Sequence, residues 1–194
     1  MKFTYLAGTS LLLAAATACS DRAVGTEPSI RATLSAASFD KGGATDRTVN
    51  ILDACDGPSF AAQNPPVLCT RNGGVTFDQL IAQLTANQSA GAWHFAPSQM
   101  DAKVGLTLFA VNKGGEVHTF THVAHFGGGI VPPLNALSNN PVPAAECLAL
   151  LTPGHDDDFI PPGGTYDEDV VGSGTSLYQC CIHPWMRTVV NGKG

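Results

Sequence analysis

Residues 178–187 decide how this chain is interpreted, and they have the sequence Tyr178-Gln179-Cys180-Cys181-Ile182-His183-Pro184-Trp185-Met186-Arg187. This stretch offers a thiolate, an imidazole and a thioether on one short segment. Two histidines and one cysteine in a trigonal plane, with a weak axial methionine, form a type 1 copper site. Soft sulfur ligands favour Cu(I) and imidazole accepts Cu(II), so a mixed set holds both oxidation states. The stretch therefore predicts Cys180, His183 and Met186 as copper ligands.

A second histidine has to come from another segment, because residues 178–187 contain only His183. The segment Gly114-Gly115-Glu116-Val117-His118-Thr119-Phe120 places His118 just after a turn, at the start of a predicted strand. A ligand from this strand would tie the two ends of a β-sandwich together. His118 is therefore the predicted remaining ligand.

Cys180 and Cys181 are adjacent, and neighbouring strand residues point to opposite faces, so both do not easily face one metal. The spacing Cys-x-x-His selects Cys180 as the ligand. Cys55, Cys69, Cys147 and Cys181 remain, and outside the cytoplasm an even set predicts disulfides in one of three pairings. We favour Cys55–Cys69 and Cys147–Cys181, because the first is local and the second would attach a long connection to the ligand loop.

The ligand motifs resemble those of the cupredoxins. Cys-x-x-His-Pro-aromatic-Met-Arg at residues 180–187 is similar to the ligand loop of amicyanin, and more broadly of plastocyanin, azurin and pseudoazurin. Asn112 followed by His118-Thr119-Phe120 is similar to the upstream histidine segment of that family, and the order His, Cys, His, Met is also the same. A Pro161-Pro162-Gly163-Gly164 turn also fits, and the resemblance covers roughly residues 92–191.

The resemblance implies one type 1 copper ion, held by ring nitrogens of His118 and His183, the Cys180 thiolate and, axially, Met186. It implies an electron carrier rather than an enzyme, with a redox protein such as a cytochrome or a membrane oxidoreductase as partner. Thr119 stands where the family often has Asn. Its hydroxyl can also form a hydrogen bond, so the change is expected to alter the tuning of the copper centre rather than to prevent copper binding. The edge of His183 is expected to be the electron exit, within an apolar patch to which Trp185 and Pro184 contribute; inward packing of Trp185 is the alternative.

Short β-prone segments dominate the pattern after residue 92, and segments 48–53 and 166–190 add further strands. One helix is predicted after Thr76, where Gln79 has capping-box spacing and apolar residues follow the helical period as far as Leu84, with Gly91 as a stop. Residues 130–164 are expected to be a long proline-rich connection. The predicted fold class is all-β: a cupredoxin-like Greek-key β-sandwich with one short inserted helix and a long connecting loop.

Residues 1–19 have the features of a targeting segment, with Lys2 before an apolar run too short to span a bilayer. Ala16-Thr17-Ala18 precedes Cys19, and this ending resembles a bacterial lipoprotein signal, in which the cysteine is lipidated. An ordinary cleaved signal peptide is the alternative. The resemblance implies a lipid anchor at Cys19 on the periplasmic or cell-surface side of a bacterial membrane.

The remaining chain divides into a flexible tether over residues 20–47, rich in Ser, Ala, Gly and Thr, and one domain over residues 48–194. The net charge is −6 and no basic cluster is present, which argues against a nucleic acid partner. Glycine (21) and proline (13) are plentiful, as suits many turns and short strands.

Several alternatives stay open on sequence alone. Cysteine and histidine also form structural zinc sites, although no pair of close cysteines with zinc-knuckle spacing is present. His122 and His125 could form a second metal site, or they could simply be exposed. The segment His155-Asp156-Asp157-Asp158 could bind a hard cation or a basic cytochrome, or it could be a solvated loop. Two rival functions are a copper-sequestering or copper-delivery lipoprotein, and a copper-free interaction domain on the same fold.

Overall fold

Strands form most of the regular structure in the computed structural model, which describes residues 48–154, 159–169 and 173–194. The first sheet has the strand order β2-β1-β4-β8, with bounds β2 (His94–Ala96), β1 (Thr48–Leu52), β4 (Thr107–Asn112) and β8 (Thr165–Asp169). The second sheet has the order β3-β10-β9-β6, with bounds β3 (Gln99–Lys103), β10 (Arg187–Lys193), β9 (Gly174–Gln179) and β6 (Thr121–Val123). A short pair joins β5 (His118–Thr119) and β7 (Phe159–Ile160).

Alternating burial along the strands shows that each sheet turns one face inward. Val49 and Ile51 are the buried positions of β1, and Leu108 and Ala110 are buried in β4. These side chains belong to the same buried cluster as Val190 of β10 in the other sheet. Such alternation is the pattern of sheets with one face on a shared core. The predicted all-β sandwich is therefore confirmed.

The pairing of β9 with β10 places the predicted ligand loop at one end of the second sheet. The two strands are antiparallel, and Gln179 is opposite Arg187. Residues 180–186 therefore form the connection between them. Two backbone hydrogen bonds close this loop: Cys180 N–H donates to Met186 O (3.0 Å), and Met186 N–H donates to His183 O (2.9 Å). The pairing of β6 with β9 brings the chain that follows His118 alongside the same loop.

The predicted helix is α2 (Phe77–Asn87), and its capping box is present. Gln79 N–H donates to Thr76 Oγ1 (3.3 Å), while Thr76 N–H donates to Gln79 Oε1 (2.9 Å). The helix ends at Asn87, before the expected stop at Gly91, and its C-cap residue Gln88 has a left-handed φ of 59°. Leu80 and Leu84 are its buried residues, so this helix packs on the domain as expected.

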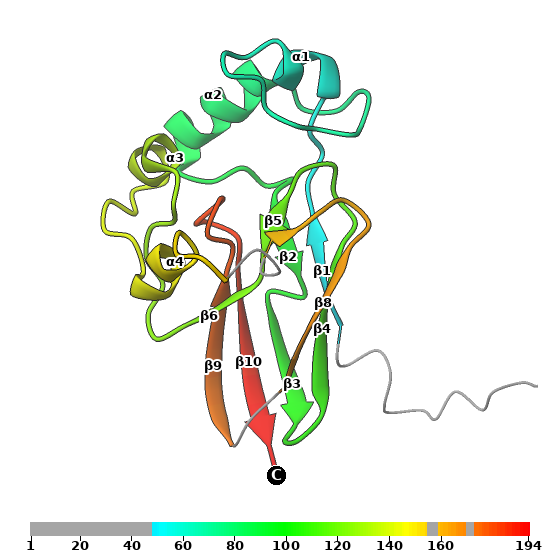
Figure 1. Cartoon of the computed structure of the whole chain (residues 1–194), viewed down its shortest axis with the longest axis vertical. Coiled ribbons are helices and arrows are strands. Elements are labelled where there is room, and N and C mark those ends of the chain that lie inside the picture. Colours follow the sequence, from blue (N-terminus) through cyan, green and yellow to red (C-terminus); the bar gives the residue numbers. More distant parts are fainter. Residues whose placement is uncertain (1–47, 155–158, 170–172) are drawn as a thin grey trace, which may run out of the picture. The chain divides into compact units, whose positions relative to one another are not determined.

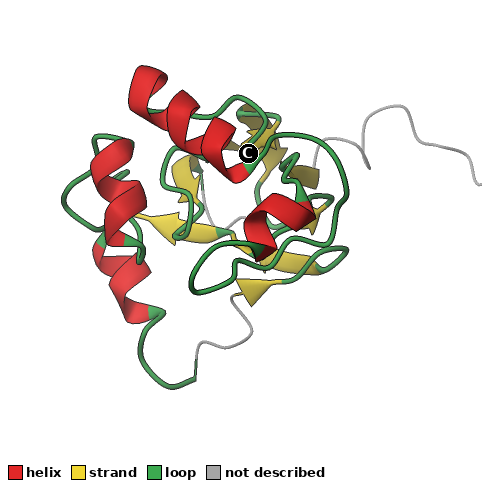
Figure 2. Ribbon diagram, turned by 90° about the horizontal axis from the view of Figure 1, so that it is seen from above, coloured by secondary structure: helices red, strands yellow, loops and turns green. Residues whose placement is uncertain are grey.

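The described residues contain three further short helices: α1 (Gly57–Ala61), α3 (Pro132–Leu137) and α4 (Ala145–Ala149). The connection over residues 130–164 is thus more structured than the predicted loop, since it holds α3, α4 and β7. Proline stands in the first turn of α1 and of α3, where its missing N–H removes no helical hydrogen bond. Figure 1 shows α1, α2 and α3 beyond the ends of the strands, and Figure 2 shows the helices from above.

The N-terminal predictions lie outside the described residues. Residues 1–19 with Cys19, and the tether over residues 20–47, therefore stay predictions, as does any role of residues 155–158. Within the part of the chain that the structure describes, no helix has the length and apolar character needed to cross a membrane.

Candidate metal centre

The structure brings His118, Cys180 and His183 together in the core. Cys180 Sγ lies 3.7 Å from His118 Nδ1 and 3.8 Å from His183 Nδ1, and the two Nδ1 atoms are 3.3 Å apart. The exposed fractions of these residues are 0%, 0% and 2%, respectively. One donor comes from β5, and the other two come from the loop between β9 and β10.

The donor spacing suits a single metal ion. Bonds of about 2.0 Å to nitrogen and about 2.3 Å to sulfur are usual for such ligands, and a trigonal plane would then separate the donors by about 3.5–3.7 Å. The observed separations of 3.3–3.8 Å are close to this range. Two imidazoles and one thiolate in such a plane are the donor set of type 1 copper. The residues present therefore fit the group that the sequence predicts.

Met186 is fully buried and belongs to the same core cluster as Cys180. Its backbone makes both of the hydrogen bonds that close the loop over residues 180–186. The predicted axial ligand is thus fixed on the same short turn as Cys180 and His183.

Thr119 connects β5 to the ligand loop. Its backbone N–H donates to Cys180 Sγ (3.4 Å), and its Oγ1 accepts a hydrogen bond from the Cys181 N–H (2.8 Å). The residue after the first histidine thus fixes the cysteine loop through its hydroxyl. The hydrogen bond to sulfur also stabilises the thiolate form of Cys180.

Two disulfides are present, Cys55–Cys69 and Cys147–Cys181, and Cys180 is the free cysteine of the described residues. These are the two pairs that the sequence favours. The Cys147–Cys181 bond joins α4 to the residue that follows Cys180, so it attaches the long connection directly to the ligand loop.

Asp53, which the sequence analysis did not single out, is the hydrogen-bond partner of His118. Its Oδ2 lies 2.9 Å from His118 Nε2, and both side chains are fully buried. Because a carboxylate only accepts, Nε2 carries the proton, which leaves Nδ1 to face Cys180. A lone acidic residue at the end of a buried strand, Thr48–Leu52, was the only signal available in the sequence.

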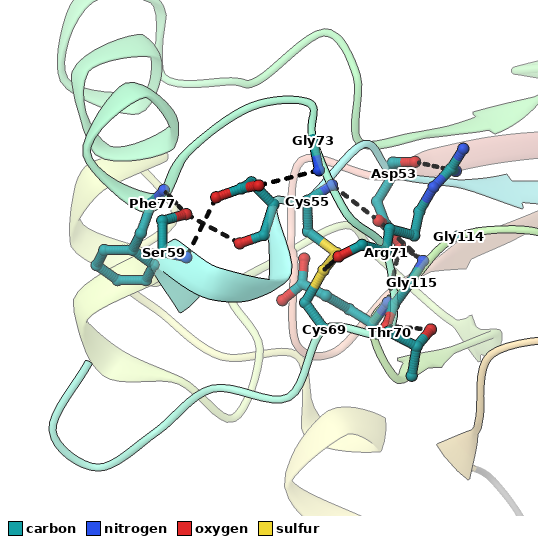
Figure 3. Close-up of a disulfide and its surroundings, with 12 residues drawn as sticks. Asp53, Cys55, Ser59, Cys69, Thr70, Arg71, Gly73, Phe77, Gly114 and Gly115 are labelled. Carbon is teal, nitrogen blue, oxygen red and sulfur yellow. Dashed lines mark hydrogen bonds between the residues drawn. A yellow bond between two sulfur atoms is a disulfide. The ribbon is translucent and has the colours of Figure 1, made fainter. Parts of the chain in front are cut away.

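The glycine turn of residues 114–115 fits tightly around Asp53. The N–H of Gly115 lies 2.8 Å from Asp53 Oδ2, and that of Glu116 lies 3.1 Å from the same atom. A Cβ added at Gly114 would lie 1.8 Å from this oxygen, so a side chain there is excluded. Figure 3 shows Asp53 beside Gly114 and Gly115, next to the Cys55–Cys69 disulfide.

Burial and hydrogen bonds shift the pKa values of Asp53, His118 and Cys180 in the metal-free site. Burial disfavours the charged form of Asp53, but hydrogen bonds from His118 and from backbone N–H groups hold its pKa below the ordinary value. Burial likewise opposes protonation of His118, yet Asp53 and Cys180 raise its pKa to about 9. Burial opposes ionisation of Cys180 as well, and hydrogen bonds from His118 and His183 bring its pKa well below 9.0. Below about pH 9, these shifts favour an imidazolium at His118 and a thiolate at Cys180 in the metal-free site.

The other ring nitrogen of His183 faces a buried carboxylate. His183 Nε2 lies 3.8 Å from Glu116 Oε2, which also accepts a hydrogen bond from Trp93 Nε1 (2.5 Å). Burial raises the pKa of Glu116, against the opposing effect of His183. Sequence reasoning missed both Glu116 and Trp93, which carry no motif.

His183 differs from the exposed electron exit that the resemblance implied, because only 2% of it is exposed. Leu80 of α2 and Leu134 of α3 line a cavity that His183 also lines. Pro184 is also buried. Trp185 is partly buried, packs against the core and meets the His183 ring edge-on at 5.3 Å, so the patch predicted around Trp185 and Pro184 lies mostly inside.

The alternative metal sites are not assembled by the described residues. His122 and His125 are both exposed, and neither belongs to a metal-holding group. Asp53, Cys55 and Glu116 do lie close together, but Cys55 is bound in a disulfide and is not free to ligate.

Comparisons with known proteins find similarity only to solved structures. No family model matches the chain, and no curated protein matches it. A purple cupredoxin from Nitrosopumilus maritimus is 14% identical, with a TM-score of 0.42 over 76% of this chain and 100% of that one. A copper(I) amicyanin variant is 18% identical, with a TM-score of 0.35 over 54% of this chain and 76% of its own. These similarities are distant, so the assignment of the site rests on the residues of this chain.

Proposed function

We propose that this protein is a type 1 copper protein that carries single electrons. The observation that supports this most directly is the buried His118–Cys180–His183 group, with donor separations of 3.3–3.8 Å and Met186 on the same loop. The sequence has no hydrolytic motif and no His-x-His pair of the kind that multicopper oxidases use, so the proposed role is that of a carrier rather than an enzyme.

A copper ion bound here would supply reversible one-electron exchange. The chain supplies a rigid and dry environment for it. Asp53 orients His118, the Thr119 N–H holds the Cys180 sulfur, and the disulfide at Cys181 restrains the loop. Because all three donors are already fixed in the core, little rearrangement of the protein is needed between oxidation states.

The proposed setting is extracytoplasmic. Two disulfides are consistent with an oxidising compartment. Together with the lipoprotein-like ending at Cys19, they support a lipid-anchored protein on the periplasmic or cell-surface side of a bacterial membrane. The proposed partner is a redox protein, such as a cytochrome or a membrane oxidoreductase.

The visible spectrum tests this function. The purified protein is mixed with one equivalent of Cu(II), beside a Cys180→Ser variant as the matched control. We expect an intense blue or purple band that ascorbate bleaches, and no such band in the variant. A colourless wild-type mixture, or a band of equal strength in Cys180→Ser, would contradict the proposed site.

The copper-delivery alternative is separated by a second measurement on the same samples. A delivery protein is expected to surrender Cu(I) readily to a chelator and to exchange electrons slowly. Retention of Cu(I) against the chelator, with fast self-exchange, supports the carrier.

A further inference from the structure

A cavity of about 420 Å³ lies directly against His183 and Glu116. This volume is within the range of about 300–1,000 Å³ that is usual for small-molecule sites. Its apolar walls come from three helices and include Phe60 of α1, Leu80 of α2 and Leu134 of α3. The predicted electron carrier has no evident need for such a cavity, since a protein partner would contact an exposed surface.

One charged group lies at the polar end of this cavity. Glu116 is 5% exposed, and its Oε2 already accepts the Trp93 indole N–H and faces His183 Nε2. The hydrogen bonds among the described residues leave the other oxygen, Oε1, without a donor. This oxygen is not among the fully buried side-chain atoms that lack a partner, so a donor can reach it from the cavity that Glu116 lines. The cavity therefore has a place for one hydrogen-bond donor.

The walls favour an aromatic ring as the body of the ligand. Phe60 and Phe77 line the cavity and meet edge-on, with ring centroids 5.3 Å apart. Aromatic rings add favourable stacked and edge-on contacts to such pairs. An anionic ligand is disfavoured because the carboxylate of Glu116 would repel it. A polyol is disfavoured because its hydroxyl groups would lose their hydration against apolar side chains.

We propose that this cavity binds a small neutral aromatic compound with one hydroxyl group, that is, a simple phenol. The ring packs between the phenylalanines of α1 and α2 and the leucines of α2 and α3, and the hydroxyl donates to Glu116. The compound then lies against the ring of His183. This site goes beyond electron transfer, and its occupation does not depend on a metal, because the cavity is lined by protein side chains alone.

The test uses 4-methylphenol as the probe and protein NMR as the readout, in both the metal-free and the copper(I)-loaded protein. The indole N–H of Trp93 reports on the site, because it donates to Glu116. We expect saturable shifts of this signal and of the amides near Leu80. Methylbenzene, which lacks the hydroxyl, is expected to bind about three to ten times more weakly, as suits the loss of one hydrogen bond.

Two variants of α2 provide a matched pair. Ile81 lines the cavity, whereas Ala82, its neighbour on the same helix, is exposed. Ile81→Trp is expected to fill the cavity and abolish binding of 4-methylphenol, while Ala82→Trp leaves it unchanged. In the copper(II)-loaded protein, 4-methylphenol is also expected to shift the visible band, since it touches the ring of His183.

Three outcomes would overturn the phenol site: no saturable shift at Trp93, binding that survives Ile81→Trp, or equal affinity for methylbenzene. Tighter binding of 4-methylbenzylammonium would also overturn it, because the site would then select a cation. Failure of the copper site is recognised separately: the blue or purple band is then absent while the metal-free protein still binds 4-methylphenol.

Discussion

Asp53 Oδ2 lies 2.9 Å from His118 Nε2, and this contact joins the end of β1 to β5 within the core. The same carboxylate accepts N–H groups from Cys55, Gly115 and Glu116. A histidine ligand held in this way has a fixed ring orientation and tautomer before any metal arrives. The carboxylate also makes the imidazole a stronger electron donor, which would favour Cu(II) over Cu(I) in a bound copper ion.

Asp53→Asn is expected to lower the free energy of unfolding of the metal-free protein by about 2–4 kcal/mol, because the amide presents N–H groups to several buried donors. It is also expected to raise the reduction potential. Urea denaturation and redox titration measure the two effects. Asp101→Asn, at an exposed ion pair with Lys193, is the control and should change neither.

The same carboxylate gives a pH dependence of known sign. The pKa of Asp53 is lowered from 3.8 in the folded state, so its stabilisation is complete above that pH and is lost as the pH falls further. In Asp53→Asn this part of the acid sensitivity should disappear. The difference in unfolding free energy between wild type and Asp53→Asn should be smaller in strong acid than at pH 7. If this difference is the same at both pH values, the role of Asp53 is contradicted.

Copper binding is expected to release about one proton from the metal-free site at about pH 8. The pKa of His118 is about 9 and that of Cys180 is well below 9.0, so the pair then holds one proton, on the imidazole. Bound copper replaces this proton at Nδ1. Affinity for Cu(I) should therefore rise with pH, by up to about tenfold per unit, and level off above the pKa of His118.

Calorimetry in buffers of different ionisation enthalpy counts these protons. A Cys180→Ser variant cannot form the ion pair and serves as the comparison. A pH-independent affinity between about pH 7 and 9, with no proton released, would show that His118 is neutral in the metal-free protein.

The ligand loop could be predicted from the sequence because its chemistry is local. Cys180, His183 and Met186 lie on one turn, so their spacing in the sequence already indicates that they lie close together. The helix over Phe77–Asn87 was likewise predicted from its capping box and period. In both cases the residues that interact are only a few positions apart.

The residues that hold the proposed ligands in place could not be predicted, because they contact the ligands from distant positions in the sequence. Asp53 and His118 are 65 positions apart, and no pattern marks a single acidic residue at the end of a strand. The cavity beside His183 is lined by residues of α2 and α3, which lie in segments outside the ligand motif. Helices as short as α1 and α4 span too few residues to show a period.

Thr119→Val is expected to destabilise the protein by about 1–2 kcal/mol, because the buried Cys181 N–H loses its acceptor while the side-chain volume is kept. The backbone N–H of residue 119 still reaches the Cys180 sulfur, so copper should be retained with a shifted visible band. Thr119→Ser keeps the hydroxyl and is the control. Equal stability of the two variants would argue that this hydroxyl does not hold the loop.

Replacing both Cys147 and Cys181 by alanine should lower the free energy of unfolding by about 3–4 kcal/mol, as the loop-closure relation gives for a sequence separation of 34. The bond adjoins Cys180, so the variant should also lose Cu(I) to a chelator faster than wild type. The control removes Cys55–Cys69, with a separation of 14 and an expected loss of about 3 kcal/mol. If the control variant loses copper faster than wild type, the Cys55–Cys69 disulfide rather than Cys147–Cys181 restrains the copper ligands.

Met186→Leu is expected to raise the reduction potential while the protein keeps its colour. Leucine has nearly the volume of methionine, so the fully buried position tolerates the change with a loss of less than about 1.5 kcal/mol. The thioether that would weakly donate to Cu(II) is removed, and the oxidised state loses part of its stabilisation. Met100→Leu, in β3, makes the same replacement at another buried position and should leave the potential unchanged. If the two variants shift the potential equally, or neither shifts it, Met186 is not the axial ligand.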